Sequence, residues 1–437
     1  MSKGIELWNQ AKQIIPGGNQ ILSKRVERFL PGLWPAYYTR AKGCEVWDMD
    51  GEKYFDFAQM GVGACSLGYA DDDINREVIE AVNESSMCTL NCYEEVELAE
   101  KLIEIHPWAD MVRYSRTGGE ACAVAVRIAR AATSKDIVAF CGYSGWHDWY
   151  ISANLGNTSN LDGQLIPGLK PKGIARNLKN TAIPFSYNKL SDLINIVNEY
   201  PNQVGTIIME PQREVDPEPG FLEGVRELAT KIGAVLIFDE VTSGFRMNYG
   251  GIHLLRDINP DIAVFGKALG NGYPISVVIG KQDVMDSAQD SFISSTFWSE
   301  RVGFVAALAT LKKMKEKKVQ ESLIYYGEKI NKGWKELAEL HDLNIHIDGI
   351  PPLTHINFEY PNSLEIQTYY SQEMLDRNYL LGASIYTTYA YNDGIIEKFL
   401  SDTDDVFKKL KVAIDQNNVA SKLRAEVIQS GFKRLTN

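Results

Sequence analysis

The stretch AVLIFDEVTSGFR (residues 234–246) begins with a run of apolar residues and passes directly into two carboxylates, Asp239 and Glu240. A continuous apolar run of this length is typical of a strand buried on both faces of a parallel sheet. An ionised carboxylate at the end of such a strand is strongly destabilised unless a cation or hydrogen-bond donors meet it. The stretch therefore predicts a buried strand that brings an acid to a cationic or hydrogen-bonding partner.

Similar apolar runs lie on both sides of this strand, and helix-like segments separate them. We expect strands at residues 136–140, 205–210, 262–267 and 275–280, and helices at residues 120–133, 190–200 and 221–233. Apolar strands that alternate with helices indicate a mostly parallel sheet with helices on both faces. The middle of the chain is therefore expected to form an α/β domain.

The two ends of the chain show another pattern. The N-terminal segment contains a short helix, Pro/Gly turns and an expected hairpin in which Asp50-Gly51 is the turn signal. From about residue 301 onward, helices dominate and short strands lie between them. We therefore expect a large central domain, residues 61–300, and a small α+β domain assembled from residues 1–60 and 301–437.

The composition excludes several classes of function. The 437 residues are 45% hydrophobic and 23% charged, which is typical of a globular protein, and the net charge of −12 argues against nucleic acid or an anionic membrane as partner. We find no apolar segment with the length of a signal peptide or a membrane span. Six cysteines in so long a chain indicate neither a disulfide framework nor a metal site. We therefore expect a cytoplasmic protein without a bound metal.

Polar residues stand at the expected carboxyl ends of several strands, which is where parallel sheets bind ligands. Asp239, Lys267 and Glu210 each close a strand, and Gly118 and Gly119 open a helix. The N–H groups and dipole at a helix N-terminus favour an anion such as phosphate. Pyridoxal 5′-phosphate (PLP) requires backbone donors for its phosphate, a carboxylate for its ring nitrogen and a lysine for its aldehyde. The combination predicts a PLP site in which the pyridinium is the partner of Asp239.

The order of these elements resembles the fold-type I, class III aminotransferases, and especially the branch that contains the glutamate-1-semialdehyde aminomutases. DEVTSGFR (239–246) is similar to the family's DEVMTGFR, and FGKALGNGYP (265–274) is similar to its lysine segment GKIIGGGLP. GCEVWDMDGEKYFDF (43–57) resembles the family's N-terminal signature. The resemblance extends over nearly the whole chain. It implies a large PLP-binding domain with a mostly parallel central sheet, and a small domain from both chain ends.

The resemblance also implies roles for residues around the cofactor ring. Lys267 would form the Schiff base with the cofactor and then move a proton between substrate and cofactor. Asp239 would pair with the ring nitrogen. Val241 and Tyr143 would pack on the two faces of the ring, and Glu210 would lie near its phenolic oxygen.

A second group of residues would hold the phosphate. The family's Ser-Gly-Thr motif reads Thr117-Gly118-Gly119 here, although a simpler role for Thr117 is to cap the helix in a capping box with Glu120. The family's Tyr-His-Gly reads Tyr-Ser-Gly at residues 143–145, and a histidine follows at position 147. Thr296 matches a family threonine that reaches the phosphate of the neighbouring subunit. This match implies an obligate homodimer with shared active sites.

Two parts of the sequence bear on the substrate. The aminomutases bind the substrate carboxylate with an N-terminal arginine, for which Arg25 is the nearest match, and Asn392 stands where they have an acid. The ω-amino-acid aminotransferases use a C-terminal arginine, but no arginine lies between Arg377 and Arg424 here. The stretch LLGASIYTTYAYNDG (380–394) offers hydroxyl groups instead, from which we expect Tyr389 and Asn392 as substrate residues.

We therefore expect a PLP-dependent aminotransferase whose partners are small molecules. The expected donor is an amino acid, glutamate, and the expected acceptor is a hydroxylated carbonyl compound, such as a sugar derivative in glycan biosynthesis. An aminomutase that acts within one substrate is the alternative, and a non-catalytic PLP-fold binding protein is a second one. The presence of both Lys267 and Asp239 argues against the non-catalytic alternative. No G-x-G-x-x-G motif follows the first expected strand, which argues against a dinucleotide-binding enzyme.

Overall fold

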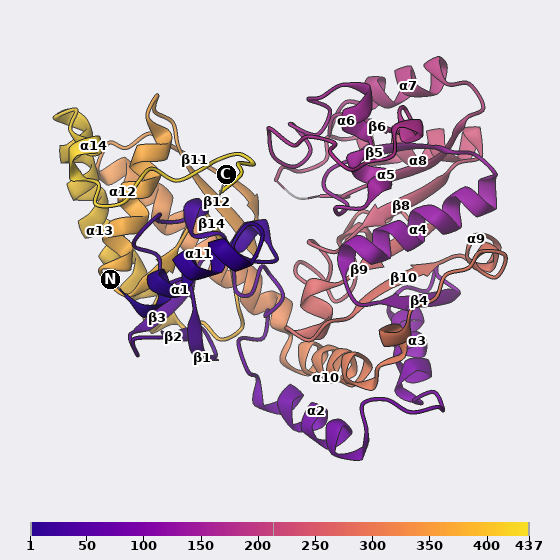
Figure 1. Cartoon of the computed structure of the whole chain (residues 1–437), viewed down its shortest axis with the longest axis horizontal. Coiled ribbons are helices and arrows are strands. Elements are labelled where there is room, and N and C mark those ends of the chain that lie inside the picture. Colours follow the sequence, from indigo (N-terminus) through magenta and orange to yellow (C-terminus); the bar gives the residue numbers. More distant parts are fainter. Residues whose placement is uncertain (1, 213, 436–437) are drawn as a thin grey trace. The chain divides into compact units, whose positions relative to one another are not determined.

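The computed structural model describes residues 2–212 and 214–435 (Figure 1). The chain divides into two compact units. The first, here called the terminal unit, comprises the residues up to Asp71 and those from Glu321 onward; the second, the central unit, comprises Asp72–Gln320. No helix of the described residues has both the length and the apolar character that crossing a membrane requires.

The central unit is built on a seven-stranded sheet with the order β4-β10-β9-β8-β7-β5-β6. Five neighbouring strands run parallel, and β10 is antiparallel to both of its neighbours. The strands are β4 (Met111–Ser115), β5 (Ile137–Cys141), β6 (Ala182–Pro184), β7 (Val204–Met209), β8 (Val235–Asp239), β9 (Ile262–Phe265) and β10 (Ser276–Gly280). The five strands expected from the apolar runs are all present, and the expectation of a mostly parallel sheet is confirmed.

Helices cover both faces of this sheet, which explains why its strands are apolar throughout. Alternate residues of a strand point to opposite faces. Val138 and Ile237 belong to the core on the side of α4 (Gly118–Thr133), whereas Ala139 and Leu236 belong to the core on the opposite face. That second core is completed by α7 (Leu190–Glu199) and α8 (Phe221–Ile232). A strand with an apolar residue at every position can bury both sets of side chains.

The other helices of the central unit lie at its two chain ends and in its loops. They are α2 (Asp72–Glu84), α3 (Glu94–Ile105), α5 (Asp148–Ile151), α6 (Ala153–Gly156), α9 (Gln282–Met285) and α10 (Arg301–Lys317). Arg301 at the start of α10 connects three of them, because its guanidinium contacts Glu84 of α2 and Glu94 of α3, each at 2.7 Å. The helix that follows the sheet thus packs on the helices that precede it.

The terminal unit joins strands from both ends of the chain. One sheet has the order β1-β2-β3-β13, and β13 pairs in parallel with β3. A second sheet has the order β11-β12-β14. The strands are β1 (Tyr38–Lys42), β2 (Glu45–Asp48), β3 (Lys53–Phe57), β11 (Ile345–Ile350), β12 (Leu353–Phe358), β13 (Tyr379–Leu381) and β14 (Ser384–Tyr386). The expected hairpin is present, and Gly51 supplies the positive φ of +87° that its turn requires.

Helices pack against these strands in an aromatic core. They include α12 (Ser363–Leu375), α13 (Asp393–Asp415), α14 (Val419–Lys422) and most of α11 (Val319–Leu340), whereas α1 (Lys3–Ile14) packs in a separate hydrophobic cluster through Trp8. Phe57 of β3 stacks on Phe399 of α13 at a ring distance of 4.1 Å and meets the edge of Tyr379 of β13. An N-terminal strand, a C-terminal strand and a C-terminal helix therefore share one hydrophobic core.

Candidate active site

The candidate site lies where the parallel strands of the central unit end. β8 ends at Asp239, Glu210 follows β7, and Lys267 follows β9 at the start of η5 (Lys267–Gly270). Because parallel strands present their carboxyl ends at one edge of a sheet, the fold brings these three residues to the same edge. Their electrostatic effects agree with this placement, since the charge of Glu210 contributes to raising the pKa of Asp239.

Asp239 is a buried acid that already has two hydrogen-bond donors. Its Oδ1 accepts a bond from the backbone N–H of Val241 at 3.1 Å, and its Oδ2 accepts one from the thiol of Cys122 at 3.2 Å. Burial, reinforced by Glu210, nevertheless raises its pKa to about 6. These donors do not replace the lost hydration, so a cation beside the carboxylate would stabilise its charged form.

Lys267 has a strained backbone and a directed amine. Its φ of +40° lies in the left-handed region, which non-glycine residues adopt mainly where the surrounding structure enforces it, often at functional sites. The Nζ atom donates a hydrogen bond to Oγ1 of Thr242 at 2.8 Å. Gly266 allows this close packing, since a Cβ atom there would lie 2.7 Å from Oγ of Ser276. The loop that follows Asp239 thus positions the lysine amine.

The N-terminus of α4 has a complete capping box. The side chain of Thr117 accepts a hydrogen bond from the backbone N–H of Glu120, and the carboxylate of Glu120 accepts one from the N–H of Thr117 at 3.0 Å. The capping role considered for Thr117 is therefore present. Its hydroxyl oxygen serves the helix itself, which leaves the other N–H groups of the first turn as the donors for an anion.

Glycines let two loops approach the start of this helix. A Cβ atom on Gly118 would lie 2.8 Å from Cγ1 of Val241, and one on Gly145 would lie 2.7 Å from the Cα atom of Gly119. Gly145 also has a φ of +105°, which side chains rarely permit. The backbone after β5 and the backbone after β8 therefore both pack against the first turn of α4.

Tyr143 and Glu210 are held together at the same edge. The backbone N–H of Tyr143 donates a hydrogen bond to Oε2 of Glu210 at 3.2 Å. Tyr143 is 37% exposed, and its ring lies edge-on to Tyr150, whose hydroxyl donates to the carbonyl of Gly142 at 3.0 Å. Burial and the nearby Cys122, Asp239 and Glu210 raise the pKa of Tyr143.

Four expected site residues do not belong to the strands that form this edge. Thr296 is an exposed residue of η7 (Thr296–Ser299) in the central unit, and no described hydrogen bond connects it with the strand edge. Arg25, Tyr389 and Asn392 belong to the terminal unit. The Asn392 side chain accepts a hydrogen bond from the N–H of Ile395 at 3.0 Å and so caps α13.

Three hydroxyl groups of the stretch 380–394 bond to backbone carbonyls. Thr387 donates to the carbonyl of Leu323 at 2.9 Å, and Tyr391 donates to the carbonyl of Asp56 at 2.7 Å. Thr388 is also fully buried and bonds to the carbonyl of Ser66. These three hydroxyls stabilise the terminal unit, and the threonine-rich composition that suggested a hydroxyl-lined pocket has this structural explanation.

Sequence reasoning missed Cys122, which contacts Asp239 directly. Cys122 lies one helical turn after Gly118, and residues four apart occupy the same face of a helix. Gly118 packs on Val241, so Cys122 faces the same end of β8. Burial and the charge of Asp239 raise the pKa of Cys122 and keep its thiol protonated as a donor. Helical spacing places Cys122 on the same helix face as Gly118, but its contact with Asp239 depends on how α4 packs on β8.

The second carboxylate of the opening stretch, Glu240, has a structural partner. Its Oε1 accepts bonds from the backbone N–H of His253 at 3.0 Å and from Nδ1 of that ring at 2.8 Å. Trp108 donates to Nε2 of His253 at 3.0 Å, and an indole can only donate, so the ring proton lies on Nδ1. Although burial raises the pKa of Glu240, the bonds from His253 outweigh it and lower that pKa.

The sequence is similar to those of known proteins. Residues 32–379 match the sequence model of the family Aminotransferase class-III. A 3-aminobutyryl-CoA aminotransferase from Cloacimonas acidaminovorans is 32% identical over 86% of this chain and 89% of the relative. A glutamate-1-semialdehyde 2,1-aminomutase 2 from Lachnoclostridium phytofermentans is 32% identical over 82% of this chain and 84% of the relative.

A solved structure, the PLP internal aldimine form of the FumI protein of Sphingopyxis sp. MTA144, has a similar fold. Its TM-score is 0.86 at 23% identity, over 97% of this chain and 98% of that one. The likeness confirms the expected fold-type I architecture. The family match identifies pyridoxal 5′-phosphate as the cofactor.

Proposed function

Because the chain belongs to the class III aminotransferases, we propose that it moves an amino group from glutamate to the carbonyl of a separate acceptor molecule. One observation carries the proposal. Asp239, a desolvated carboxylate with a pKa raised to about 6, ends a strand at the sheet edge that also holds the strained Lys267. This pairing of a base that needs a cation with a directed amine is what amino-group chemistry on PLP requires.

The residues of the sheet edge fit this cofactor. When bound, PLP supplies an electrophilic carbon and a ring that withdraws electrons from the substrate. Asp239 would hold the proton of the ring nitrogen, and the N–H groups of Gly118 and Gly119 would hold the phosphate at the positive end of α4. Val241 and Tyr143 would pack on the two ring faces.

Lys267 would carry the proton that moves during the reaction. We propose that its amine takes a proton from the substrate carbon and returns one at the end of each half-reaction. The hydroxyl of Thr242, 2.8 Å from Nζ, would keep the amine in place between these steps. The carboxylate of Glu210 accepts a hydrogen bond from the N–H of Tyr143. It would therefore lie on the same side of the cofactor as Tyr143.

Arg25 is proposed to receive a carboxylate of the substrate, with help from Arg28. Nε of Arg25 and Nη1 of Arg28 are buried and have no hydrogen-bond partner among the described residues. Burial and the neighbouring Arg25 lower the pKa of Arg28, which shows that the two cations lie close together. A carboxylate between them would supply the missing acceptors and offset their repulsion. The acceptor is therefore proposed to carry an anionic group besides its carbonyl.

The hydroxylated acceptor expected from the sequence stays a prediction. Its support now rests on Tyr389, since Thr387, Thr388 and Tyr391 bond to backbone atoms. A role in glycan biosynthesis depends on that acceptor. The name of the 3-aminobutyryl-CoA aminotransferase supports another acceptor, a 3-oxoacyl-CoA, whose product would be an acyl-CoA with an amino group at position 3.

The second candidate is an intramolecular amino transfer of the glutamate-1-semialdehyde type. The similarity to the glutamate-1-semialdehyde 2,1-aminomutase 2 favours this candidate. Against it stands Asn392, which replaces the acid of the aminomutases and caps a helix in this chain. The two candidates differ in whether an external donor leaves the enzyme as a separate oxo acid.

A half-reaction assay separates these candidates. The PLP-loaded protein is mixed with glutamate, and the release of 2-oxoglutarate is followed together with the visible absorption of the cofactor. Acceptors are then added to the aminated enzyme: a hydroxylated aldehyde, a 3-oxoacyl-CoA and an oxo acid. Release of 2-oxoglutarate that Lys267→Ala abolishes supports the proposal. Isomerisation of glutamate-1-semialdehyde without any reaction of an external donor would establish the aminomutase instead.

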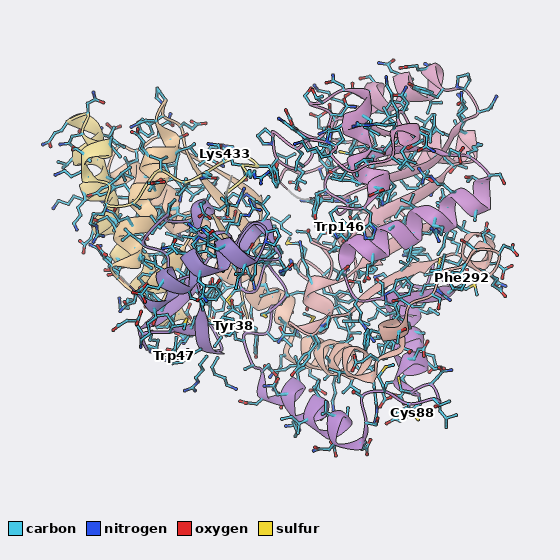
Figure 2. All side chains as sticks on the ribbon, viewed as in Figure 1. Tyr38, Trp47, Cys88, Trp146, Phe292 and Lys433 are labelled. Atoms are coloured by element: carbon cyan, nitrogen blue, oxygen red, sulfur yellow. The ribbon has the colours of Figure 1, made fainter. Side chains whose placement is uncertain are left out.

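We further propose that the chain forms a homodimer through the central unit. Several large apolar side chains of this unit are exposed, among them Leu90 at 79% and Phe292, which is labelled in Figure 2, at 87%. Thr296 is the residue expected to reach a neighbouring subunit, and Phe297, which follows it directly, is also exposed. Exposed apolar residues in such numbers mark interaction surfaces. Sedimentation equilibrium should show a dimer that Leu90→Asp dissociates, and a wild-type monomer would refute the pairing.

A further inference from the structure

The loop after β5 contains a histidine whose inner nitrogen has no partner. Nε2 of His147 is buried and makes no hydrogen bond with the described residues. Buried nitrogens in native proteins almost always have a partner, so an unpaired one indicates a group that binds there. None of the sequence motifs assigns a function to this histidine.

The position of His147 is well fixed. Its carbonyl accepts hydrogen bonds from the N–H groups of Tyr150 at 2.9 Å and Ile151 at 3.1 Å, as the cap of the short helix α5. Its ring stacks on Trp146, labelled in Figure 2, at a centroid distance of 4.6 Å and an angle of 27°. A side chain held by both its backbone and its ring is positioned to act as a donor.

The ring edge with the unpaired nitrogen faces the start of α4. A Cβ atom placed on Gly119 would lie 3.5 Å from Cδ2 of His147, and Cδ2 is bonded to Nε2. Gly145 allows this approach, because its backbone packs so closely on Gly119 that a side chain at position 145 would have no room. The imidazole therefore lies beside the second residue of the helix, next to the N–H groups proposed to hold the phosphate.

Gly119 lacks a side chain that could donate a hydrogen bond to a phosphate. The family that the chain resembles has a threonine there, whereas Gly119 has no hydroxyl, and the Thr117 hydroxyl caps the helix. We propose that Nε2 of His147 donates a hydrogen bond to the phosphate of PLP and so takes the place of that hydroxyl. This inference rests on the proposed role of the α4 N-terminus as the phosphate site. Hydrogen bonds between a fixed donor and an ionised oxygen are among the strong ones in proteins.

The test compares two ligands that differ only in the phosphate. The dissociation constants of PLP and pyridoxal are measured by fluorescence titration for the cofactor-free wild type, His147→Ala and His147→Phe. Phenylalanine keeps the stacking on Trp146 but has no donor. Both variants should bind PLP roughly 10- to 100-fold more weakly than the wild type, and pyridoxal equally well. Asp148→Asn, a change in an exposed neighbouring residue, should change neither constant.

A rescue variant adds a second condition. A Cβ atom at Gly119 has only ordinary contacts, so serine fits there. The double variant Gly119→Ser, His147→Ala should regain PLP affinity relative to His147→Ala. Equal loss of PLP and pyridoxal affinity in both His147 variants would show a structural role, and unchanged PLP affinity would also overturn the assignment. If the wild type binds no PLP at all, the proposed function fails, whereas wild-type binding without an effect of His147 refutes this inference alone.

Discussion

Asp239→Asn is expected to stabilise the cofactor-free protein while it weakens cofactor binding. Without a cationic partner, burial holds the pKa of Asp239 at about 6 instead of the ordinary 3.8. Asparagine has nearly the same shape, and its side-chain oxygen can keep one of the bonds from Val241 and Cys122. It carries no charge, so it avoids the cost of an ionised group that is almost completely buried.

The magnitude follows from the two pKa values. They differ by about 2 pH units, and one unit corresponds to about 1.36 kcal/mol, so the charged side chain costs the folded state about 3 kcal/mol. Because the pKa is raised on folding, this cost is absent below pH 3.8, where both states are protonated, and is complete above pH 6. Asp239→Asn should therefore raise the free energy of unfolding by up to about 3 kcal/mol at pH 7.5.

The assay is urea denaturation of the cofactor-free wild type and variant at pH 7.5, 5 and 4, followed by fluorescence. The advantage of the variant should shrink as the pH falls and nearly vanish at pH 4. Addition of PLP should reverse the order at pH 7.5, because only the carboxylate gains a charged partner. The reasoning would be refuted if the variant were less stable than the wild type at pH 7.5. It would also be refuted if the difference in the free energy of unfolding were the same at every pH.

Three further changes test the packing around the site. Gly145→Ala places a Cβ atom 2.7 Å from the Cα atom of Gly119 and should weaken PLP affinity about tenfold or more in an equilibrium titration. The control Gly163→Ala places its Cβ atom in open space and should leave PLP affinity unchanged. Glu240→Ala leaves buried donors without an acceptor and should lower the free energy of unfolding by about 3 kcal/mol in urea; an unchanged midpoint would contradict its structural role. Thr242→Val removes the acceptor of the lysine amine and should lower kcat about tenfold with normal PLP uptake, and an unchanged kcat would show that the hydroxyl is dispensable.

The features that could be predicted are those that depend on local pattern. The apolar runs identified the strands of the central sheet, because a strand covered on both faces needs an apolar residue at nearly every position. The convergence of Asp239, Glu210 and Lys267 then followed from the parallel arrangement, which places all carboxyl ends at one edge. No long-range contact had to be known for either step.

The features that could not be predicted depend on contacts between distant segments. Cys122 and Asp239 are far apart in the sequence, and only the packing of α4 on β8 brings the thiol to the carboxylate. The hydroxyl of Thr387 could equally have faced a pocket, and its bond to the carbonyl of Leu323 depends on how α11 packs. The partner of Glu240 is likewise a residue later in the chain, His253. Composition describes which groups are available, and tertiary packing decides which of them are already used.

Identification of the lysine that PLP modifies is the most direct test of the active site at the strand edge. The protein is loaded with PLP, reduced with borohydride, digested and mapped by mass spectrometry. The modification is expected on the peptide that contains Lys267, with loss of the visible absorption, and it should be absent from Lys267→Ala. A modification at another lysine of the chain, or a protein that takes up no PLP, would contradict the assignment of Lys267 and Asp239 as the reactive pair.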